Sequence, residues 1–317
     1  MNLNKRMINR FKSFVLIGVQ PIIRCWENRY FEIGKDVEHQ PVFIIGAPRT
    51  GSTILYQALT NCYQFAYIDN IACTWHRNLR FGLWLSNKKY GNDPHNNFKA
   101  EHGNTEKFGG HAPSECGQFW YRWLPKDRHF IDYDDITEKM VAEIRTEVFD
   151  ASNYLKKPIL FKNLNAGQRL RLISKAFPEA KIIYVKRDPR FVVRSIVKAR
   201  GKVGIKPGQW WSIMPPNVKE LLKLPESEMC AAQVYYLEKQ IEKDLLLFPD
   251  QNVKKIHYQN FSKELLEHLT RWCGVSQRSH SETPVFRQDD INHLTPNERN
   301  HLNEIVAKYD FEKETFA

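Results

Sequence analysis

Short apolar runs alternate with segments of helical periodicity along this chain. Runs with the length of buried strands lie at 41–45, 65–68, 158–161, 181–185 and 253–258. Segments that read as helices, from apolar residues at intervals of three and four or from a capping residue, lie at 53–60, 114–124, 136–154, 166–177, 231–248, 262–272 and 295–309. Because strands that alternate with helices form parallel sheets with crossover helices, the pattern predicts an α/β fold with a covered parallel sheet.

Residues 74–111 break this pattern. They are rich in Trp, Asn, His and Gly and show no steady period, which is typical of a long functional insertion. We expect residues 74–130 to supply contacts to a substrate. No linker rich in Pro, Gly or Ser divides the chain, so a single domain over 1–317 is predicted, with 1–40 as an N-terminal helical extension.

The N-terminal extension is basic, with Lys5, Arg6, Arg10 and Lys12 ahead of an apolar run at 14–19. That run is far shorter than the roughly 20 residues of a membrane span. Two interpretations stay open: a helix that packs on the domain, or an amphipathic segment in peripheral contact with a membrane surface.

The composition narrows the classes of partner. A formal charge of +11 favours an anionic ligand, an acidic polymer or a membrane surface. Acidic residues separate the basic ones and no zinc-finger, RNP or basic-zipper pattern is present, which disfavours nucleic acid. Six cysteines without a C-x-x-C pair indicate neither a zinc site nor a disulfide framework, so reduced thiols in a cytoplasmic protein are expected.

The segment 46–53 reads GAPRTGST and follows the first apolar run directly. A strand, a Gly-bounded turn and a helix start leave several backbone N–H groups directed at one point, where the helix dipole also favours negative charge. Arg49 adds a cation, and Ser52 and Thr53 add hydroxyl donors. The motif therefore predicts a phosphate site, with a plain strand-to-helix turn as the alternative.

The motif lacks the lysine of a nucleoside-triphosphate P-loop. That loop reads G-x-x-x-x-G-K-[ST], and its lysine contacts the β- and γ-phosphates. The spacing from Gly46 to Gly51 fits, but Ser52 stands at the lysine position. We therefore expect a ligand whose terminal group is not handled as a magnesium-bound γ-phosphate.

A second segment, 186–195, reads KRDPRFVVRS, follows a later strand and opens another helix. Pro189 suits a first helical turn. Arg187 precedes the helix and Ser195 lies about two turns along it, so a guanidinium fork and a hydroxyl are offered to a phosphate. Two anion sites on one sheet imply a ligand with phosphates at both ends.

Together these motifs resemble those of the sulfotransferases that use 3′-phosphoadenosine 5′-phosphosulfate (PAPS). Residues 48–53 match the family's Pro-[Arg/Lys]-[Ser/Thr]-Gly-[Ser/Thr]-Thr loop for the 5′-phosphosulfate, and Arg187, Pro189 and Ser195 match its segment for the 3′-phosphate. The resemblance extends over 41–61 and 158–212. It implies a three-layer α/β/α, P-loop-NTPase-like domain. The donor-binding residues it implies are Arg49, Thr50, Gly51, Ser52, Thr53, Arg187 and Ser195.

The resemblance also implies the chemistry. Such an enzyme transfers a sulfuryl group to a hydroxyl or amine without a metal and releases 3′-phosphoadenosine 5′-phosphate (PAP). The expected acceptor is a carbohydrate, a glycolipid or another hydroxylated molecule. The family uses a Glu or a His as the base, and the candidates are Glu115 and His111, ahead of His76 and His129. For Glu115 the alternative is a capping carboxylate in the first turn of a helix.

Lys162 matches the lysine of a Lys-[Thr/Asp/Asn]-Pro element in related enzymes, although Leu164 stands where that element has Pro. Since ligands gather at strand ends in α/β sheets, Lys162 either contacts the transferred group or is a surface lysine. Trp210 and Trp211 are expected to pack in the core, with a stacking wall for the acceptor as the alternative. The segment 257–261 is expected to be structural.

Two other function classes stay open at the level of sequence. A nucleotide kinase or triphosphatase would need the P-loop lysine that this chain lacks. A noncatalytic binding protein for a nucleotide or an acidic polymer would use the same anion sites without group transfer.

Overall fold

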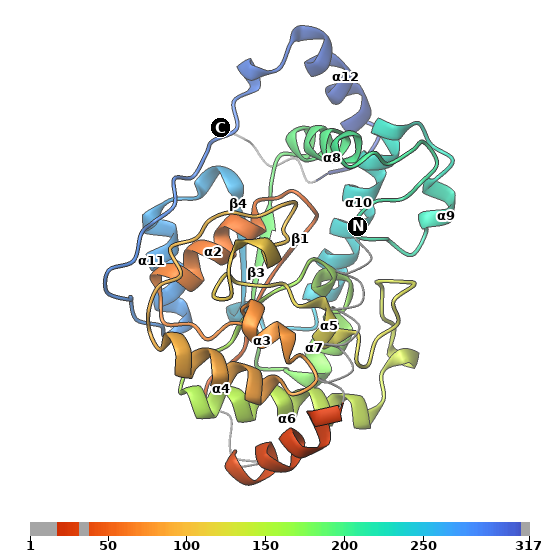
Figure 1. Ribbon diagram of the computed structural model, residues 1–317. Coiled ribbons are helices and arrows are strands. Elements are labelled where there is room, and N and C mark those ends of the chain that lie inside the picture. The colour runs from red at the N-terminus through yellow and green to blue at the C-terminus, as the bar shows by residue number, and fades with distance from the viewer. Residues whose placement is uncertain (1–17, 32–37, 312–317) are drawn as a thin grey trace, which may run out of the picture.

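The structure, a computed structural model, describes residues 18–31 and 38–311. The strands of its sheet are β1 (Val42–Gly46), β2 (Leu160–Lys162), β3 (Lys181–Lys186) and β4 (Val253–His257). They run parallel in the order β2-β1-β3-β4. The predicted α/β fold with a central parallel sheet is confirmed, and Figure 1 shows the sheet surrounded by helices.

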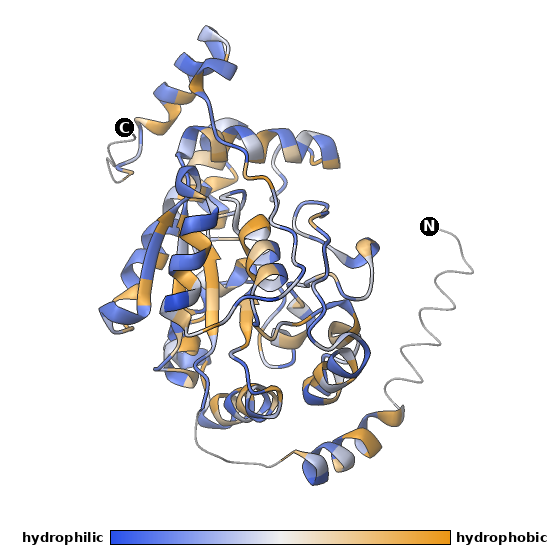
Figure 2. Cartoon of the chain, turned by 90° about the vertical axis from the view of Figure 1, so that its left-hand side faces the viewer, coloured by the Kyte–Doolittle hydropathy of each residue, from blue (hydrophilic) through white to orange (hydrophobic). Residues whose placement is uncertain are grey.

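Helices cover both faces of the sheet. Those that pack directly on it are α2 (Ser52–Cys62), α6 (Glu138–Leu155), α7 (Leu170–Ala176), α10 (Glu226–Leu245) and α11 (Lys263–Cys273). Successive residues of a strand point to opposite sides, so Phe43 and Ile45 join one core with α6, α7 and α10, whereas Val42 and Ile44 join another with α2 and α11. The result is three layers, and Figure 2 shows the strands as predominantly hydrophobic.

A third apolar cluster lies beyond the carboxyl end of β3. It is built by α8 (Pro189–Val203), α9 (Val218–Leu221), α10 and α12 (Pro296–Val306). Two predicted helix starts are confirmed. Ser262 caps α11 by accepting a hydrogen bond from the Leu265 N–H at 3.2 Å, and Pro189 stands in the first turn of α8.

The predicted strand at 65–68 is wrong. A single isolated bridge forms there, between Ala66 and Ile159. Arg278 donates hydrogen bonds of 2.8 Å to the carbonyl oxygens of Tyr63 and Phe65. A side chain thus satisfies backbone groups that a neighbouring strand would otherwise bond, and the segment stays irregular.

The segment 74–111 contains a helix that the hydrophobic pattern did not reveal, α4 (Leu79–Tyr90), preceded by the short α3 (Asn70–Thr74). The buried face of α4 includes two polar side chains. Arg80 pairs with Asp150 at 2.8 Å and Ser86 donates to Asp69 at 2.5 Å. Because buried polar groups interrupt the apolar stripe, the period of three and four is lost in the sequence.

Two other predicted helices are shorter in the structure. Within 114–124 only α5 (Gly117–Trp120) is helical. Cys116 at its N-cap has a left-handed conformation with a φ of 37°, so the helix does not extend back through it. Within 166–177 a 3₁₀ turn at Leu164–Gln168 precedes α7. Both departures lie next to Lys162 and Glu115, the residues described below.

Residues 18–30 form a helix that packs on the domain. Glu27 accepts hydrogen bonds from the Asn78 side chain at 3.0 Å and from the Phe81 N–H at 2.9 Å. This agrees with the packed-helix interpretation for the described part of the extension, while the basic residues at 5–12 lie outside it. None of the described helices combines the length and the apolar character that crossing a membrane requires.

Candidate active site

The loop after β1 is held in a conformation that glycine and local hydrogen bonds dictate. A Cβ atom on Gly46 would lie 2.6 Å from the Val185 carbonyl oxygen, so only glycine fits beside β3. Arg49 has a φ of 70°, a backbone strain that is typical of functional loops. Thr50 is buried and donates to the Ala47 carbonyl at 3.0 Å. Thr50 therefore closes the loop and does not line the adjoining pocket.

The start of α2 offers unpaired backbone donors. Gly51 is the N-cap, has a φ of 90°, and provides no side chain to cap the helix. The first backbone bond of the helix is the one from Leu55 to the Gly51 carbonyl at 3.2 Å. Among the described residues, the N–H groups of Ser52 and Thr53 thus have no backbone acceptor, as expected at a helix start that binds an anion.

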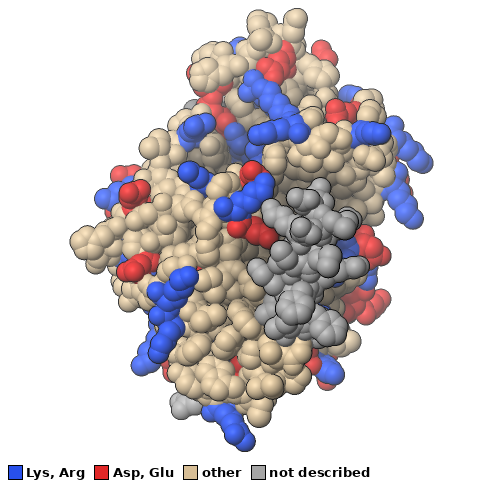
Figure 3. All heavy atoms as spheres, in the orientation of Figure 1, with Lys and Arg blue, Asp and Glu red and all other residues tan. Residues whose placement is uncertain are grey.

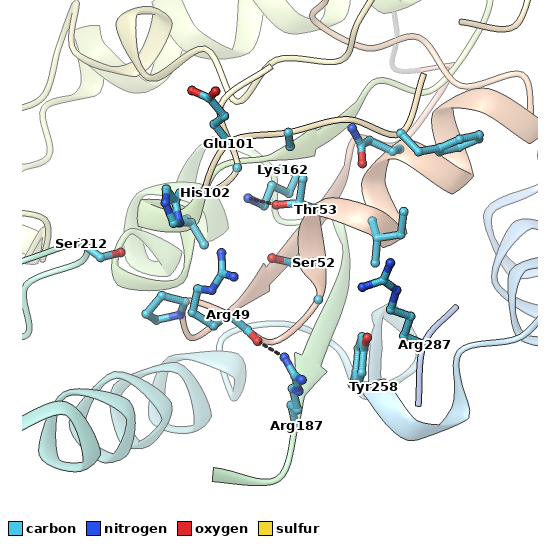
Figure 4. A pocket seen from close by; sticks show the side chains of 18 of the residues that line it. Arg49, Ser52, Thr53, Glu101, His102, Lys162, Arg187, Ser212, Tyr258 and Arg287 are labelled. Atoms are coloured by element: carbon cyan, nitrogen blue, oxygen red, sulfur yellow. Dashed lines mark hydrogen bonds between the residues drawn. The ribbon is translucent and has the colours of Figure 1, made fainter. Parts of the chain in front are cut away.

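A pocket of about 810 Å³, here the large pocket, opens at the carboxyl ends of the strands. Its lining includes Arg49, Ser52, Thr53, Lys162 and Arg187, as Figure 4 shows. Gly51 lines it as well. Its volume lies within the range of about 300–1,000 Å³ that is usual for ligand sites. Figure 3 shows Lys and Arg side chains gathered around a recess on the same face of the molecule.

The two predicted phosphate motifs meet directly. The Arg49 Nε donates to the Ser195 Oγ at 2.9 Å, and Arg187 donates to the Arg49 carbonyl at 2.8 Å. Burial lowers the pKa of Arg49, and the charge of Arg187 lowers it further. An anion bound beside the two guanidinium groups would offset the repulsion between their positive charges.

Arg187 is not free in this structure. It pairs with Asp289 through two hydrogen bonds of 2.7 and 2.5 Å, and its guanidinium lies 4.4 Å from the centre of the Tyr258 ring. Arg187, Ser195 and Asp289 line a further pocket of about 390 Å³, here the second pocket. It shares Arg49, His102, Arg187 and Lys202 with the large pocket. The chain segment before α12 thus closes this end of the site.

Glu115, Lys162 and Thr53 form the opposite end. The Lys162 amine donates to the Glu115 Oε1 and to the Thr53 Oγ1, the latter at 3.1 Å. The side chain of Lys162 is only 2% exposed, so the alternative of a surface lysine is wrong. Gly103 passes close by, and a Cβ atom there would lie 2.7 Å from the Glu115 Oε1.

Leu164, which replaces the Pro of the resembling element, has a structural role that proline could not fill. Its backbone N–H donates to the Glu115 Oε2 at 3.1 Å. A proline has no N–H and would leave this carboxylate oxygen without the bond. Glu115 therefore accepts at both oxygens, from Lys162 and from Leu164, and is fixed at the pocket wall.

A further pocket of about 500 Å³ lies beside Glu115, and we call it the Glu115 pocket. Its lining includes Glu115, Gln118, Asn104, His76 and His102. His102, Gly103 and Leu164 line both this pocket and the large pocket. The carboxylate thus stands where the two hollows join.

The other histidines predicted as candidates lie in different surroundings. His111 stacks on Tyr90 with ring centres 4.0 Å apart and contacts Asp69 at 3.2 Å, and it lines neither the large pocket nor the Glu115 pocket. The His129 Nδ1 accepts from the Met214 N–H at 2.8 Å, and burial lowers its pKa to about 4. The structure brings Glu115, not His111, to Lys162.

Three residues of the site carried no functional signal in the sequence. His102 has a φ of 51° and lies edge-on to Trp211, with ring centres 5.9 Å apart. Burial and the charge of Arg49 lower its pKa. Tyr258, expected to be structural, lines the large pocket, and Asp289 lines the second pocket. These residues come from distant segments, so no motif unites them.

Trp210 and Trp211 pack against the cluster of α8, α10 and α12, as predicted. Trp211 also lines the large pocket, so the alternative of a wall at the ligand holds for it as well. No group of three His, Cys, Asp or Glu side chains in the described part of the chain has the arrangement of a metal site.

Comparisons with known proteins bear on this site. Residues 41–278 match the model of a family described as "Sulfotransferase family". Among solved structures, a sulfotransferase of Mycobacterium tuberculosis is similar at 12% identity with a TM-score of 0.54, over 95% of this chain and 85% of that one. A sulfotransferase of Alicyclobacillus acidocaldarius is similar at 17% identity with a TM-score of 0.44, over 86% of this chain and 93% of that one. No curated protein matches the sequence.

Proposed function

The chain belongs to the sulfotransferase family, and we propose that it transfers a sulfuryl group from PAPS to a hydroxyl or amine of an acceptor, in the first place a carbohydrate or glycolipid. The observation that carries this proposal is the arrangement of the site. Arg49 and Arg187 line the large pocket together with Lys162, Ser195 bonds Arg49 at 2.9 Å from the adjoining pocket, and Lys162 pairs with Glu115 of the Glu115 pocket.

The residues present fit a nucleotide with phosphates at both ends. The helix-start amides of Ser52 and Thr53 with Arg49 would hold the 5′ end, and Ser195 with Arg187 would hold the 3′-phosphate. When bound, PAPS supplies the activated sulfuryl group. Charge-assisted hydrogen bonds contribute roughly 1.5–3 kcal/mol each, so a few of them account for much of the donor's affinity.

The Glu115 end would handle the acceptor. We assign Glu115 as the base that takes the acceptor proton, because it lies where the large pocket meets the Glu115 pocket. Lys162 reaches both Glu115 and Thr53, so its amine can stabilise negative charge that develops on the leaving phosphate oxygen. Residues 74–130 would then form the acceptor side of a single domain.

The kinase or triphosphatase alternative lacks support at the loop. Ser52 stands at the position of the P-loop lysine and is 4% exposed, so no amine is placed there for a γ-phosphate. The binding-protein alternative differs from the proposal only in turnover.

The test combines calorimetry and transfer of labelled sulfate. We expect PAP to bind without added metal, and labelled sulfate to move from PAPS to a hydroxylated acceptor in the presence of EDTA. Magnesium-dependent ATP turnover without PAP binding would overturn the proposal in favour of the kinase class. PAP binding without transfer to any member of a broad acceptor panel would favour the binding protein.

A further inference from the structure

The Glu115 pocket adjoins another hollow. This basic pocket has a volume of about 540 Å³ and shares His76 and Gln118 with the Glu115 pocket. The Glu115 pocket also shares lining residues with the large pocket, so the three hollows adjoin in a row from the donor loop past Glu115 to the basic pocket, and we call this row the groove. An acceptor whose hydroxyl lies at Glu115 can therefore extend away from the donor.

The far end of this groove is rich in cations. Among the described residues that line the basic pocket, the charged ones are Arg24, Arg77, Arg122, Lys126 and Glu143. Glu147 engages Arg24 and Arg122. In the described part of the chain no carboxylate pairs with Arg77 or Lys126, so both cations are open to a ligand.

His76 lies where the Glu115 pocket meets the basic pocket, and the nearby cations affect its pKa. Burial lowers its pKa, and the charges of Arg77, Arg122 and Lys126 lower it further, although its bond to the Cys73 carbonyl acts in the opposite direction. A carbonyl oxygen only accepts, so the His76 Nδ1 donates in that contact of 3.2 Å and Nε2 is an acceptor. The junction is thus neutral and the far pocket is positive.

The walls between Glu115 and the cations suit a hydroxyl-rich ligand. The side-chain oxygen of Asn104 accepts from the Glu106 N–H at 2.8 Å, and that of Gln118 accepts from the Cys73 thiol at 3.6 Å. The amide NH₂ group of each has no protein partner among the described residues and is left to donate. Together with the His76 acceptor, the groove offers donors and acceptors rather than a continuous apolar wall for a lipid chain.

We propose that the acceptor is an anionic carbohydrate, with its reacting hydroxyl at Glu115 and its anionic substituent paired with Arg77 and Lys126 in the basic pocket. This inference rests on the proposed function and specifies its acceptor class. Glu106 and Glu115 line the near end of the groove and repel an anionic substituent there. Charge therefore sets the direction in which the sugar lies as well as its class.

The test measures binding to the PAP-loaded protein at low ionic strength. The probes are a neutral glucose tetrasaccharide and a tetrasaccharide of the same length with alternating glucuronic acid. We expect the acidic sugar to bind about tenfold more tightly, because two exposed ion pairs of ordinary strength supply roughly that factor. The advantage should shrink as salt is added.

Paired variants sharpen the test. The double variant Arg77→Gln/Lys126→Gln should lose the preference for the acidic sugar, raise its KM in transfer and leave kcat unchanged, because neither residue touches the reacting atoms. The double variant Lys219→Gln/Lys223→Gln removes two cations that line none of these pockets and should retain the preference.

Equal affinity for the two sugars, no binding of either, or a preference retained in the Arg77→Gln/Lys126→Gln protein would overturn the inference. So would tighter binding and transfer to an acidic tyrosine peptide than to the acidic sugar. PAP titration of the same samples separates the two levels. Protein that binds PAP and sulfates a neutral sugar equally well refutes the anionic acceptor alone, whereas protein that does not bind PAP refutes the proposed function.

Discussion

The donor side and the acceptor side of this site are built in different ways. On the donor side, strand ends deliver the groups directly: the loop 48–53 leaves β1 and Arg187 follows β3. On the proposed acceptor side, Glu115 lies in irregular chain and is fixed by contacts with Lys162 at the end of the edge strand β2 and with Leu164 just after it. The proposed donor residues are therefore placed by local sequence, whereas the placement of the proposed base depends on long-range contacts.

The largest effect should come from removing the base alone. Glu115→Gln keeps the size of the side chain but only one of its two acceptors, so one of the bonds from Lys162 and Leu164 is lost. The loop 48–53, Arg187 and Ser195 are untouched, so PAP affinity should be retained. Turnover should fall by about 10²–10⁴, the usual contribution of a general base. Calorimetry and labelled sulfate transfer measure the two quantities on one sample.

Glu106→Gln is the matched control, because Glu106 also lines the Glu115 pocket and is exposed. It should retain turnover. A Glu115→Gln protein with near-normal kcat would show that the base lies elsewhere, and His102 would then be the next residue to replace.

Removing a cation of the proposed donor side should weaken PAP binding, which removal of the proposed base should leave unchanged. Arg49→Ala deletes the guanidinium that bonds Ser195, and PAP binding should weaken by about 10- to 100-fold, the worth of one or two charge-assisted hydrogen bonds. Arg187→Ala should weaken PAP binding by at least about tenfold as well. It also breaks the pair with Asp289, so Arg49→Ala is the cleaner variant.

Arg271→Ala, which removes an exposed arginine of α11 outside the pockets, serves as the control for lost charge. Unchanged PAP affinity in Arg49→Ala would mean that the loop amides alone hold the nucleotide.

A smaller effect tests the long-range placement of the base. In Gly103→Ala, the new Cβ would lie 2.7 Å from the Glu115 Oε1, and the residue would keep a φ of 94°. We expect about 1–3 kcal/mol of lost stability from backbone strain. A fall in kcat of about tenfold should follow from a displaced carboxylate, while PAP affinity is retained.

Gly109→Ala separates the effect of backbone strain from the effect of the contact with Glu115. Gly109 has a φ of 104° but open space around its Cβ position, so this variant should lose stability without losing kcat. If both variants lose kcat equally, strain in the insertion matters and the contact with Glu115 does not.

The smallest effect on activity concerns the anchor of the insertion. Burial lowers the pKa of His95 to about 3, and its Nδ1 accepts from the Asn97 N–H at 3.1 Å. The unfolded chain, with a pKa near 6.5, binds the proton more readily, so stability is lost as pH falls from about 6.5 toward 3. The loss should approach roughly 1 kcal/mol per pH unit.

Thermal melts between pH 7 and pH 4 measure this loss, and His95→Gln should flatten the dependence without changing kcat at neutral pH. A slope that is the same in both proteins would place the acid sensitivity in other buried groups, such as His129.

The sequence predicted the placement of the two phosphate motifs at strand ends, because that information is local. Apolar runs mark the strands, and the residues after β1 and β3 carry the motifs. Lys162 and Glu115 could be named from their motifs, but not their contact, since 47 positions separate them. The replacement of Pro by Leu164 put the predicted turn in doubt. In the structure the backbone N–H of Leu164 bonds the Glu115 carboxylate.

The proposed acceptor side was harder to predict, because contacts of polar side chains determine the structure of this part of the chain. Arg80 and Ser86 interrupt the apolar stripe of α4, and Arg278 replaces the partner strand expected at 65–68. His102 and Asp289 reach the site from segments without regular periodicity. No short-range pattern encodes such contacts, so only the three-dimensional arrangement reveals them.

The Arg187–Asp289 pair turns nucleotide binding into an exchange reaction. Asp289 accepts from the Nε and Nη2 of the guanidinium, and Nη1 donates to the Arg49 carbonyl. A phosphate that takes the Nε–Nη2 side must expel Asp289, so the affinity for a ligand bound there is the difference between two ion pairs rather than the strength of one. If PAPS binds as proposed, the segment that carries Asp289 loses this contact when nucleotide is present, and protease digestion with and without PAP measures the change.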